Sequence, residues 1–450
     1  MPLRFWTLSC VAVLCAVSTT TSAQPASPPP PAAPVPQQTP TTEVTARNTP
    51  EVPPPESDSE RVLKTMLEAL HVYGILKPTV TFSGGAVESF SNPNAGAITA
   101  AANPVLANLP DDARLSLQVA QSRFGLWVNE KGPVRGHIEF DFIDFAKASP
   151  TVQALIRLRI ATVEWNVTDH VLITAGQDWD LHAPINPFGV NLVGGHFVSG
   201  NTGFMRQQIK LFYSVPGAFE IAGAIGLQSA NATPKDAAVE LARTPTIALR
   251  GTALLGKAGK LGVSGIATSL RLAPGPTERR ALAGAFGVFG DVTFLESFNA
   301  RFEGYLGRNA ANLGLLAIGQ GVVSHDVAEA GFFASLRKTF DQHAVYATYS
   351  QAQVLDKDAV VPSYSYPSGG GTGDEPPALS TAALAGTGPG MRWNQALRVG
   401  YDFKPWKPLA LAIEGFWYQS RHVLVAGDEE RVGSPRRSAL GADVAMVYTF

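Results

Sequence analysis

The sequence predicts an all-β protein: a 16-stranded antiparallel transmembrane β-barrel with a short N-terminal helical periplasmic extension. The chain ends at Phe450 in an alternating segment that places Val444, Met446 and Tyr448 on one face. Similar alternating segments precede it, separated by short and long connections in turn. No stretch after the N-terminus reaches the roughly 20 consecutive apolar residues of a membrane helix. A chain that stops in mid-strand suits a closed barrel, whose last strand pairs with its first.

The first 23 residues have the pattern of a signal peptide. Arg4 gives a basic start, an apolar stretch follows, and residues 21–23 offer small side chains for cleavage. Both cysteines, Cys10 and Cys15, lie in this segment. The mature chain is therefore expected to contain neither a disulfide nor a reactive thiol.

Two segments are predicted before the barrel. Residues 24–56 are dominated by Pro, Ala, Thr and Gln, which predicts a disordered periplasmic linker. Residues 57–76 carry apolar side chains at three- and four-residue spacing: Leu63, Met66, Leu67, Leu70 and Tyr73. This spacing predicts a short helix. Because such a helix is marginal alone in water, it is expected to pack on the barrel mouth or on its own copies in an oligomer.

Residues 77–450 are predicted to form the barrel. Short connections, such as those near 130–133 and 166–169, alternate with long ones, such as those near 181–202 and 355–391. The connections separate about sixteen strands. This layout is typical of outer-membrane barrels, and an even number of strands places both ends of the barrel in the periplasm.

Charged residues on one face of the predicted strands are expected to line the lumen, since the other face must meet lipid. In residues 135–142, charged and polar residues alternate with Ile138, Phe140 and Phe142. The predicted lining residues are Arg135, Glu139, Asp141, Arg157, Arg159, Arg206, Lys210, Arg301, Glu303, Arg398 and Glu414. Five tryptophans are predicted to lie near strand ends, in the interfacial girdles: Trp165, Trp179, Trp393, Trp406 and Trp417.

Two interpretations of the lining residues remain open. The basic residues could form a ladder that biases traffic toward anions, with the acidic residues facing them across the pore. Alternatively, oppositely charged residues could pair across neighbouring strands and stiffen the wall. The apolar connection 181–202 is predicted to fold into the barrel as its constriction; the alternative is a loop that contacts a trimer partner or lipopolysaccharide.

Several short motifs carry a resemblance to a known family. They are Ser122-Arg-Phe-Gly125, Ile138-Glu-Phe-Asp-Phe142, Arg157-Leu-Arg159 and Ala175-Gly-Gln-Asp-Trp179. Together they resemble the early strands of trimeric Gram-negative porins, and most closely those of the DcaP-like family. The resemblance implies a sixteen-stranded homotrimer, in a family of which some members pass dicarboxylates. It also implies an N-terminal extension that can trimerise as a coiled coil.

Other function classes find less support. The net charge of −2 argues against a nucleic-acid partner. The histidines lack metal-ligand spacing, so no metal or cofactor is expected. A barrel enzyme such as a lipase or protease would need a Ser, His and acid cluster, and no Gly-x-Ser-x-Gly motif supports one. A plugged barrel that serves as an envelope anchor is a further alternative.

The function predicted from the sequence is that of a non-enzymatic outer-membrane porin of a Gram-negative bacterium. It would form a water-filled channel for passive diffusion of small hydrophilic solutes, with anionic, dicarboxylate-like solutes as the favoured class. Its expected partners are outer-membrane lipid, lipopolysaccharide, two further copies of itself, and the barrel-assembly machinery through Phe450.

Overall fold

The computed structural model describes the following residues: 68–84, 113–143, 156–192, 195–203, 205–228, 244–271, 280–319, 326–355, 364–365, 378–379, 391–422 and 436–450. The predicted signal peptide, the linker and residues 57–67 lie outside these ranges. Contacts divide the chain into Met1–Glu56 and Ser57–Phe450, and every described residue belongs to the second unit. Within the described part, no helix is long and apolar enough to cross a membrane.

One antiparallel sheet contains eighteen strands. These are β1 (Leu70–Leu76), β2 (Thr79–Ser83), β3 (Arg114–Gln118), β4 (Arg123–Val128), β5 (Val134–Asp141), β6 (Arg157–Asn166), β7 (Val171–Trp179), β8 (Met205–Val215), β9 (Phe219–Gly226), β10 (Thr246–Leu254), β11 (Gly259–Arg271), β12 (Arg280–Phe294), β13 (Phe298–Arg308), β14 (Ala328–Phe340), β15 (His343–Val354), β18 (Met391–Trp406), β19 (Leu409–His422) and β20 (Arg436–Thr449). The short strands β16 (Tyr364–Ser365) and β17 (Ala378–Leu379) pair separately, and two 3-10 turns are η1 (Gly256–Ala258) and η2 (Ala310–Leu313).

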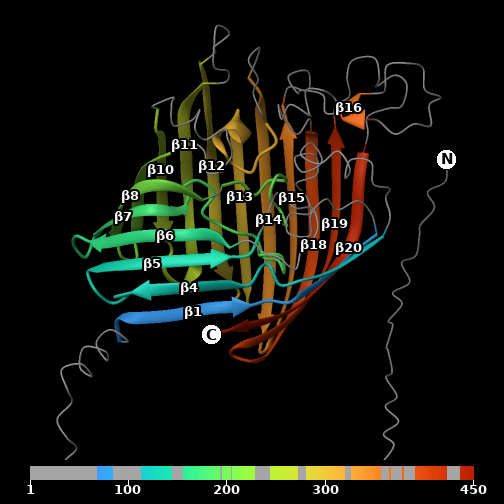
Figure 1. Cartoon of the computed structure of the whole chain (residues 1–450), viewed down its shortest axis with the longest axis horizontal. Helices are drawn as coiled ribbons and strands as arrows, with labels where there is room; N and C mark the ends of the chain where they lie inside the picture. Colours follow the sequence, from blue (N-terminus) through green and yellow to red (C-terminus); the bar gives the residue numbers. More distant parts are fainter. Residues whose placement is uncertain are drawn as a thin grey trace, which may run out of the picture. The chain divides into compact units, whose positions relative to one another are not determined.

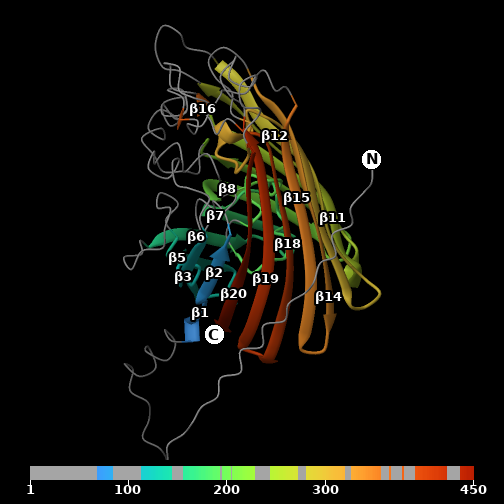
Figure 2. The same ribbon diagram turned by 90° about the vertical axis from the view of Figure 1, so that its right-hand side faces the viewer.

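The sheet closes into a barrel of sixteen strands (Figure 1). The first barrel strand consists of β1 and β2, interrupted at Lys77 and Pro78, and the second consists of β3 and β4. β20 pairs with β19 on one side and with β1 and β2 on the other, and Figure 2 shows β2 between β3 and β20. At the seam, the Gly74 amide donates to the Phe450 carbonyl at 3.0 Å and the Phe450 amide to the Gly74 carbonyl at 3.1 Å.

Residues 70–76 correct one prediction. They form strand β1, not the end of a helix, so the barrel begins at Leu70 and not at residue 77. Leu70, Val72 and Leu76 point outward and are exposed, while Tyr73 points inward toward β5. The pairing of β1 with β4 and β20 satisfies backbone groups that an isolated short helix would leave to water, and therefore outweighs the helical spacing.

The strands have an apolar outer face and a polar inner face. In β20, Val444 and Met446 are about half exposed (50% and 49%), while Asp443 and Ala445 are buried at 4% and 3%. The same alternation exposes Ile209 and Leu211 in β8 and buries Lys210 between them, where only 5% of its surface is accessible. The two faces predicted from alternation are therefore confirmed in these strands.

Aromatic residues follow the predicted girdles in part. Trp165 and Trp406 lie at strand ends and are 49% and 67% exposed. Trp179 instead packs against a buried apolar cluster that includes Phe197 and Val198, and the Arg159 guanidinium lies 5.5 Å from its ring centroid. The girdle prediction is therefore wrong for Trp179, which belongs to the interior.

Candidate functional site

The connection between β7 and β8 folds into the barrel, as predicted. We call residues 181–192 and 195–203 the inner segment; most of them are buried. Three of its backbone amides donate to side chains of the wall: Ile185 to Glu303 at 2.7 Å, Phe188 to Ser335 at 3.1 Å, and Val190 to Glu414 at 3.0 Å. The acceptors lie on β13, β14 and β19, so the segment crosses several strands of the inner wall.

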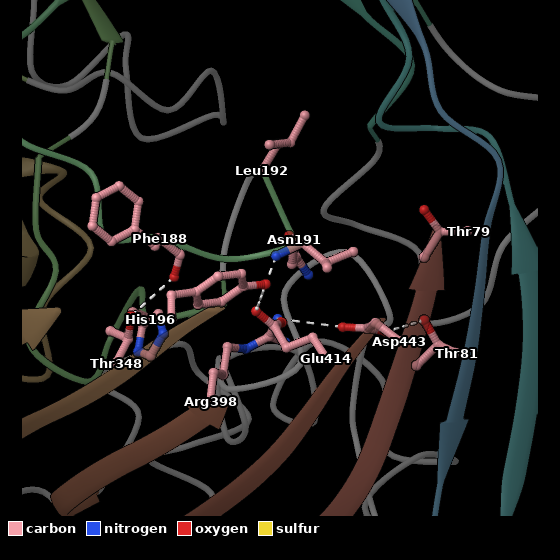
Figure 3. A network of polar contacts seen from close by, with 12 residues as sticks. Thr79, Thr81, Phe188, Asn191, Leu192, His196, Thr348, Arg398, Glu414 and Asp443 are labelled. Carbon is pink, nitrogen blue, oxygen red and sulfur yellow. Dashed lines mark hydrogen bonds and ion pairs between the residues drawn. The ribbon is translucent and has the colours of Figure 1, made fainter. Parts of the chain in front are cut away.

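Carbonyl oxygens of the inner segment also accept hydrogen bonds from side chains of the wall, and Figure 3 shows the bond from Thr348 to Phe188. The donors and acceptors are Thr348 to Phe188 at 3.0 Å, Asn394 to Val198 at 3.1 Å, Arg301 to Asn186 at 3.2 Å, and Arg123 to Leu192 at 3.0 Å. A loop with its amides and carbonyls both paired to the wall avoids the cost of unsatisfied buried backbone. These contacts fix the inner segment inside the barrel.

Arg398 of β18 and Glu414 of β19 form the centre of one charged network (Figure 3). Both are almost completely buried, at 1% and 0% exposure. The Arg398 guanidinium donates to Glu414, to Asp443 at 3.3 Å and to the Tyr418 hydroxyl at 2.7 Å. The Glu414 carboxylate also accepts from the Tyr346 hydroxyl at 2.7 Å. The network is thus charge-paired and supports the inner segment through the Val190 amide.

Glu139 and Asp141 of β5 face Arg157 and Arg159 of β6. Arg157 donates to both oxygens of Asp141, at 2.8 and 2.6 Å. Arg159 bridges the two acids, at 2.6 Å to Glu139 and 3.0 Å to Asp141. Two cations therefore neutralise two carboxylates on neighbouring strands.

The two predicted basic residues of β8 are also paired. Arg206 donates to Asp180 with both arms of its guanidinium, and to the carbonyl oxygens of Leu227, Gln228 and Leu313. Lys210 donates to Asp178. Arg206 is 1% exposed. It therefore stabilises the inner wall through these bonds and is not a side chain open to solution.

Two remaining predicted arginines are more accessible. Arg135 pairs with Glu164 at 2.7 Å. Arg301 pairs with Asp291 at 3.1 Å, and its guanidinium lies 4.3 Å from the ring centroid of Phe188. Each predicted cation on the inner face thus has a carboxylate partner. The structure favours the interpretation in which these residues pair across neighbouring strands and stiffen the wall. Their role in solute selection stays a prediction.

A second infolded segment was not predicted from the sequence. Residues 309–319, between β13 and β14, pack against small apolar side chains of β9 to β12, including Ala222, Ala248 and Ala283. The Glu329 carboxylate accepts the amides of Ile318 at 2.9 Å and Gly319 at 2.6 Å. The sequence offered one signal, since these strands carry alanine at inward positions where others carry charge.

His182 and His196 of the inner segment are buried, at 2% and 3% exposure. His196 Nδ1 lies 2.7 Å from Ser350 Oγ, but its Nε2 is buried without a hydrogen-bond partner. The pKa of His182 is lowered to about 4, mainly by burial; the nearby Asp180 opposes this shift and Arg206 adds to it. Burial also holds the pKa of His196 well below its usual range. No group of metal-ligating side chains occurs among the described residues.

The fold is similar to solved outer-membrane barrels. A high-pH structure of Pseudomonas putida OprB has a TM-score of 0.51 and 10% identity, over 87% of this chain and 96% of that chain. An anion-selective porin from Comamonas acidovorans has a TM-score of 0.49 and 12% identity, over 85% and 99%. OmpT, an outer membrane protein of Vibrio cholerae, folded in vitro, has a TM-score of 0.47 and 13% identity, over 85% and 97%.

No protein-family model matches the sequence, and no curated protein matches it. Membership of the DcaP-like family accordingly stays a prediction. At 10% identity, the likeness to OprB concerns the fold, and it agrees with the strand pairing found here: a closed antiparallel barrel of the porin type.

Proposed function

We propose that the protein is an outer-membrane channel for passive diffusion of small hydrophilic solutes. The observation that carries the proposal is the polarity of a closed barrel, apolar outside and charged inside. Leu115, Leu249 and Leu306 are 74%, 62% and 61% exposed on the outer face. Leaving one such side chain in water forgoes about 1.5–3 kcal/mol, so a belt of them needs a lipid environment.

The inner surface suits hydrophilic solutes of either charge. Three ion pairs with partial exposure lie toward the short-turn ends of the strands: Arg250–Glu220, Arg301–Asp291 and Arg337–Asp402. Charges of both signs near a water-filled mouth keep it wet and disfavour apolar solutes. Preference for anionic or dicarboxylate solutes is part of this proposal, and it requires a cation without a carboxylate partner.

The proposed location is the outer membrane of a Gram-negative bacterium, with the N-terminal extension in the periplasm. Lipid and lipopolysaccharide would cover the outer face. Phe450, which closes the seam and remains 43% exposed, is the proposed contact for the barrel-assembly machinery. We also propose a homotrimer, which native mass spectrometry in detergent would test.

Single-channel recording in a planar bilayer tests the channel. The purified full-length protein is expected to give stepwise conductance that persists when residues 24–67 are deleted, because all sixteen barrel strands lie after this region. Absence of conductance from protein with the circular dichroism of a folded barrel would contradict the proposal. It would favour the anchor alternative, in which the inner segment and residues 309–319 plug the barrel.

A further inference from the structure

Residues 309–319, which we call the second segment, occupy the side of the lumen next to β9 to β12. Leu313 and Ala317 of the segment are 0% and 1% exposed, and they belong to one apolar cluster with Ala222 and Ala248 of the wall. Burial of these side chains favours the infolded position. The second segment therefore narrows the open cross-section of the barrel from this side.

Glu329 of β14 binds the end of the second segment through a single oxygen. Its Oε2 accepts the Ile318 amide at 2.9 Å and the Gly319 amide at 2.6 Å. The side chain is 0% exposed, and Oε1 has no hydrogen-bond partner among the described residues. A methyl group at Gly307 would lie 3.3 Å from Oε1, and one at Gly319 would lie 3.1 Å from Oε2. The carboxylate is thus enclosed between the wall and the second segment.

This carboxylate has no counter-charge, since no cation of the described part of the chain forms an ion pair with it. Glu139, Asp141 and Glu414 of the inner wall are instead paired with arginines. An ionised carboxylate that is enclosed without a partner is costly, whereas the same group in water is not. Two effects therefore oppose each other in the infolded position: apolar burial favours it, and desolvation of Glu329 disfavours it.

The second segment is also held at fewer points than the inner segment. Besides the two bonds to Glu329, Arg206 donates to its Leu313 carbonyl at 3.1 Å, and the Val198 amide donates to its Leu316 carbonyl at 3.0 Å. Side chains of the wall bind three amides and four carbonyls of the inner segment. Of the two infolded segments, the second is therefore the one that can leave while the other stays.

We propose that the second segment is a gate, which leaves the wall of β9 to β12 and moves the channel to a state of higher conductance. The proposal rests on the proposed channel function and concerns its regulation. Release admits water to Glu329 and so removes the desolvation penalty. The wall behind the segment consists largely of alanine, so the apolar area that release exposes is small. Two packings with such a small difference in free energy act as a two-state switch.

A disulfide that ties the second segment to the wall tests the gate. In Gly319→Cys with Glu329→Cys, the two thiols lie within bonding reach, because a β-carbon at position 319 would lie 3.3 Å from Cγ of Glu329. In a planar bilayer, the oxidised variant is expected to show one low conductance level. Reduction with dithiothreitol is expected to add openings to a higher level. The wild-type protein that starts at residue 24 contains no cysteine, so it should conduct alike under both conditions.

Two single substitutions of Glu329 provide a second measurement, which decides if the disulfide does not form. Glu329→Ala leaves the Ile318 and Gly319 amides without an acceptor in the infolded position, so the ratio of open to closed time at the higher level should rise roughly tenfold. Glu329→Gln keeps an acceptor oxygen and removes the buried charge, so the same ratio should fall below that of the wild type.

The outcomes separate the gate from the channel. Identical conductance levels in the oxidised and reduced double variant would overturn the gate and leave the channel standing. Shifts of the same sign in Glu329→Ala and Glu329→Gln would do the same. A wild-type protein that folds, and conducts neither before nor after these changes, would overturn the channel itself and the gate with it.

Discussion

The guanidinium of Arg206 donates to one carboxylate and three carbonyl oxygens while it is 1% exposed. In Arg206→Met, the buried Asp180 carboxylate would lose the guanidinium as its ion-pair partner. We expect the free energy of unfolding to fall by about 3–5 kcal/mol. Arg206→Lys should recover part of the loss, because it restores the charge but not the fork. Urea titration of the refolded protein, followed by tryptophan fluorescence, measures both.

Arg308→Met is the control for the Arg206 prediction. Arg308 also pairs with an aspartate, Asp326, but its side chain is 56% exposed. Exposed ion pairs contribute about 0–1 kcal/mol, so this variant should unfold close to the wild type. If the two variants lost the same free energy of unfolding, burial would not be the reason that the Arg206 ion pair stabilises the barrel.

The lowered pKa of His182, in the inner segment, predicts that the stability of the folded protein depends on pH. Its folded pKa, about 4, lies below the unfolded value of about 6.5, because burial disfavours the imidazolium. Between these values the unfolded state binds the proton, so stability is complete above pH 6.5 and falls as the pH drops toward 4. Thermal unfolding between pH 7 and pH 4.5 should show a smaller drop in His182→Asn than in the wild type. If the unfolding temperature dropped equally in His182→Asn and in the wild type, His182 would be excluded as a source of the pH dependence.

At the scale of elements, alternation predicts the direction of a side chain but not its partner. The inward directions of Glu139, Arg159 and Arg398 follow from a period of two along each strand. Their ion pairs depend on register between strands, which a single sequence does not specify. The spacing of residues 63–73 favours a helix locally, and the closure of β1 against β20 is a long-range contact that local spacing does not reveal.

The hydrogen bonds between the inner segment and the wall predict how fast amide hydrogens of the segment exchange. Glu303→Met with Ser335→Ala removes the acceptors of the Ile185 and Phe188 amides. Each lost bond contributes about 1 kcal/mol, so amide exchange in the segment should quicken by roughly 30-fold. Hydrogen exchange read by mass spectrometry on peptides of the segment measures it. Thr339→Ala, at an exposed position of β14, should leave exchange unchanged. A similar quickening there would indicate general loosening of the barrel.

At the scale of the whole molecule, sixteen strands act as one unit only if the first and the last meet. Outward apolar residues and an aromatic end made closure predictable, whereas the filling of the interior by residues 309–319 was not. The alanine and leucine residues of that segment are compatible with a surface loop as well as with a buried one. The segment is buried because the inner face of β9 to β12 is apolar and packs against it.

Gly74 makes closure of the barrel testable. A methyl group there would lie 2.5 Å from the Arg123 carbonyl oxygen and 2.7 Å from the Phe450 ring, so one side of the seam must shift. Gly74→Ala is expected to cost about 1–3 kcal/mol of stability through overpacking. At Gly251, the nearest atom would be 4.0 Å away, so Gly251→Ala should stay within about 0.5 kcal/mol of the wild type. Heat-modifiable migration on gels, read as the temperature at which half of the protein unfolds, compares them. If both variants unfold at the wild-type temperature, the seam between β1 and β20 does not limit the stability of the barrel.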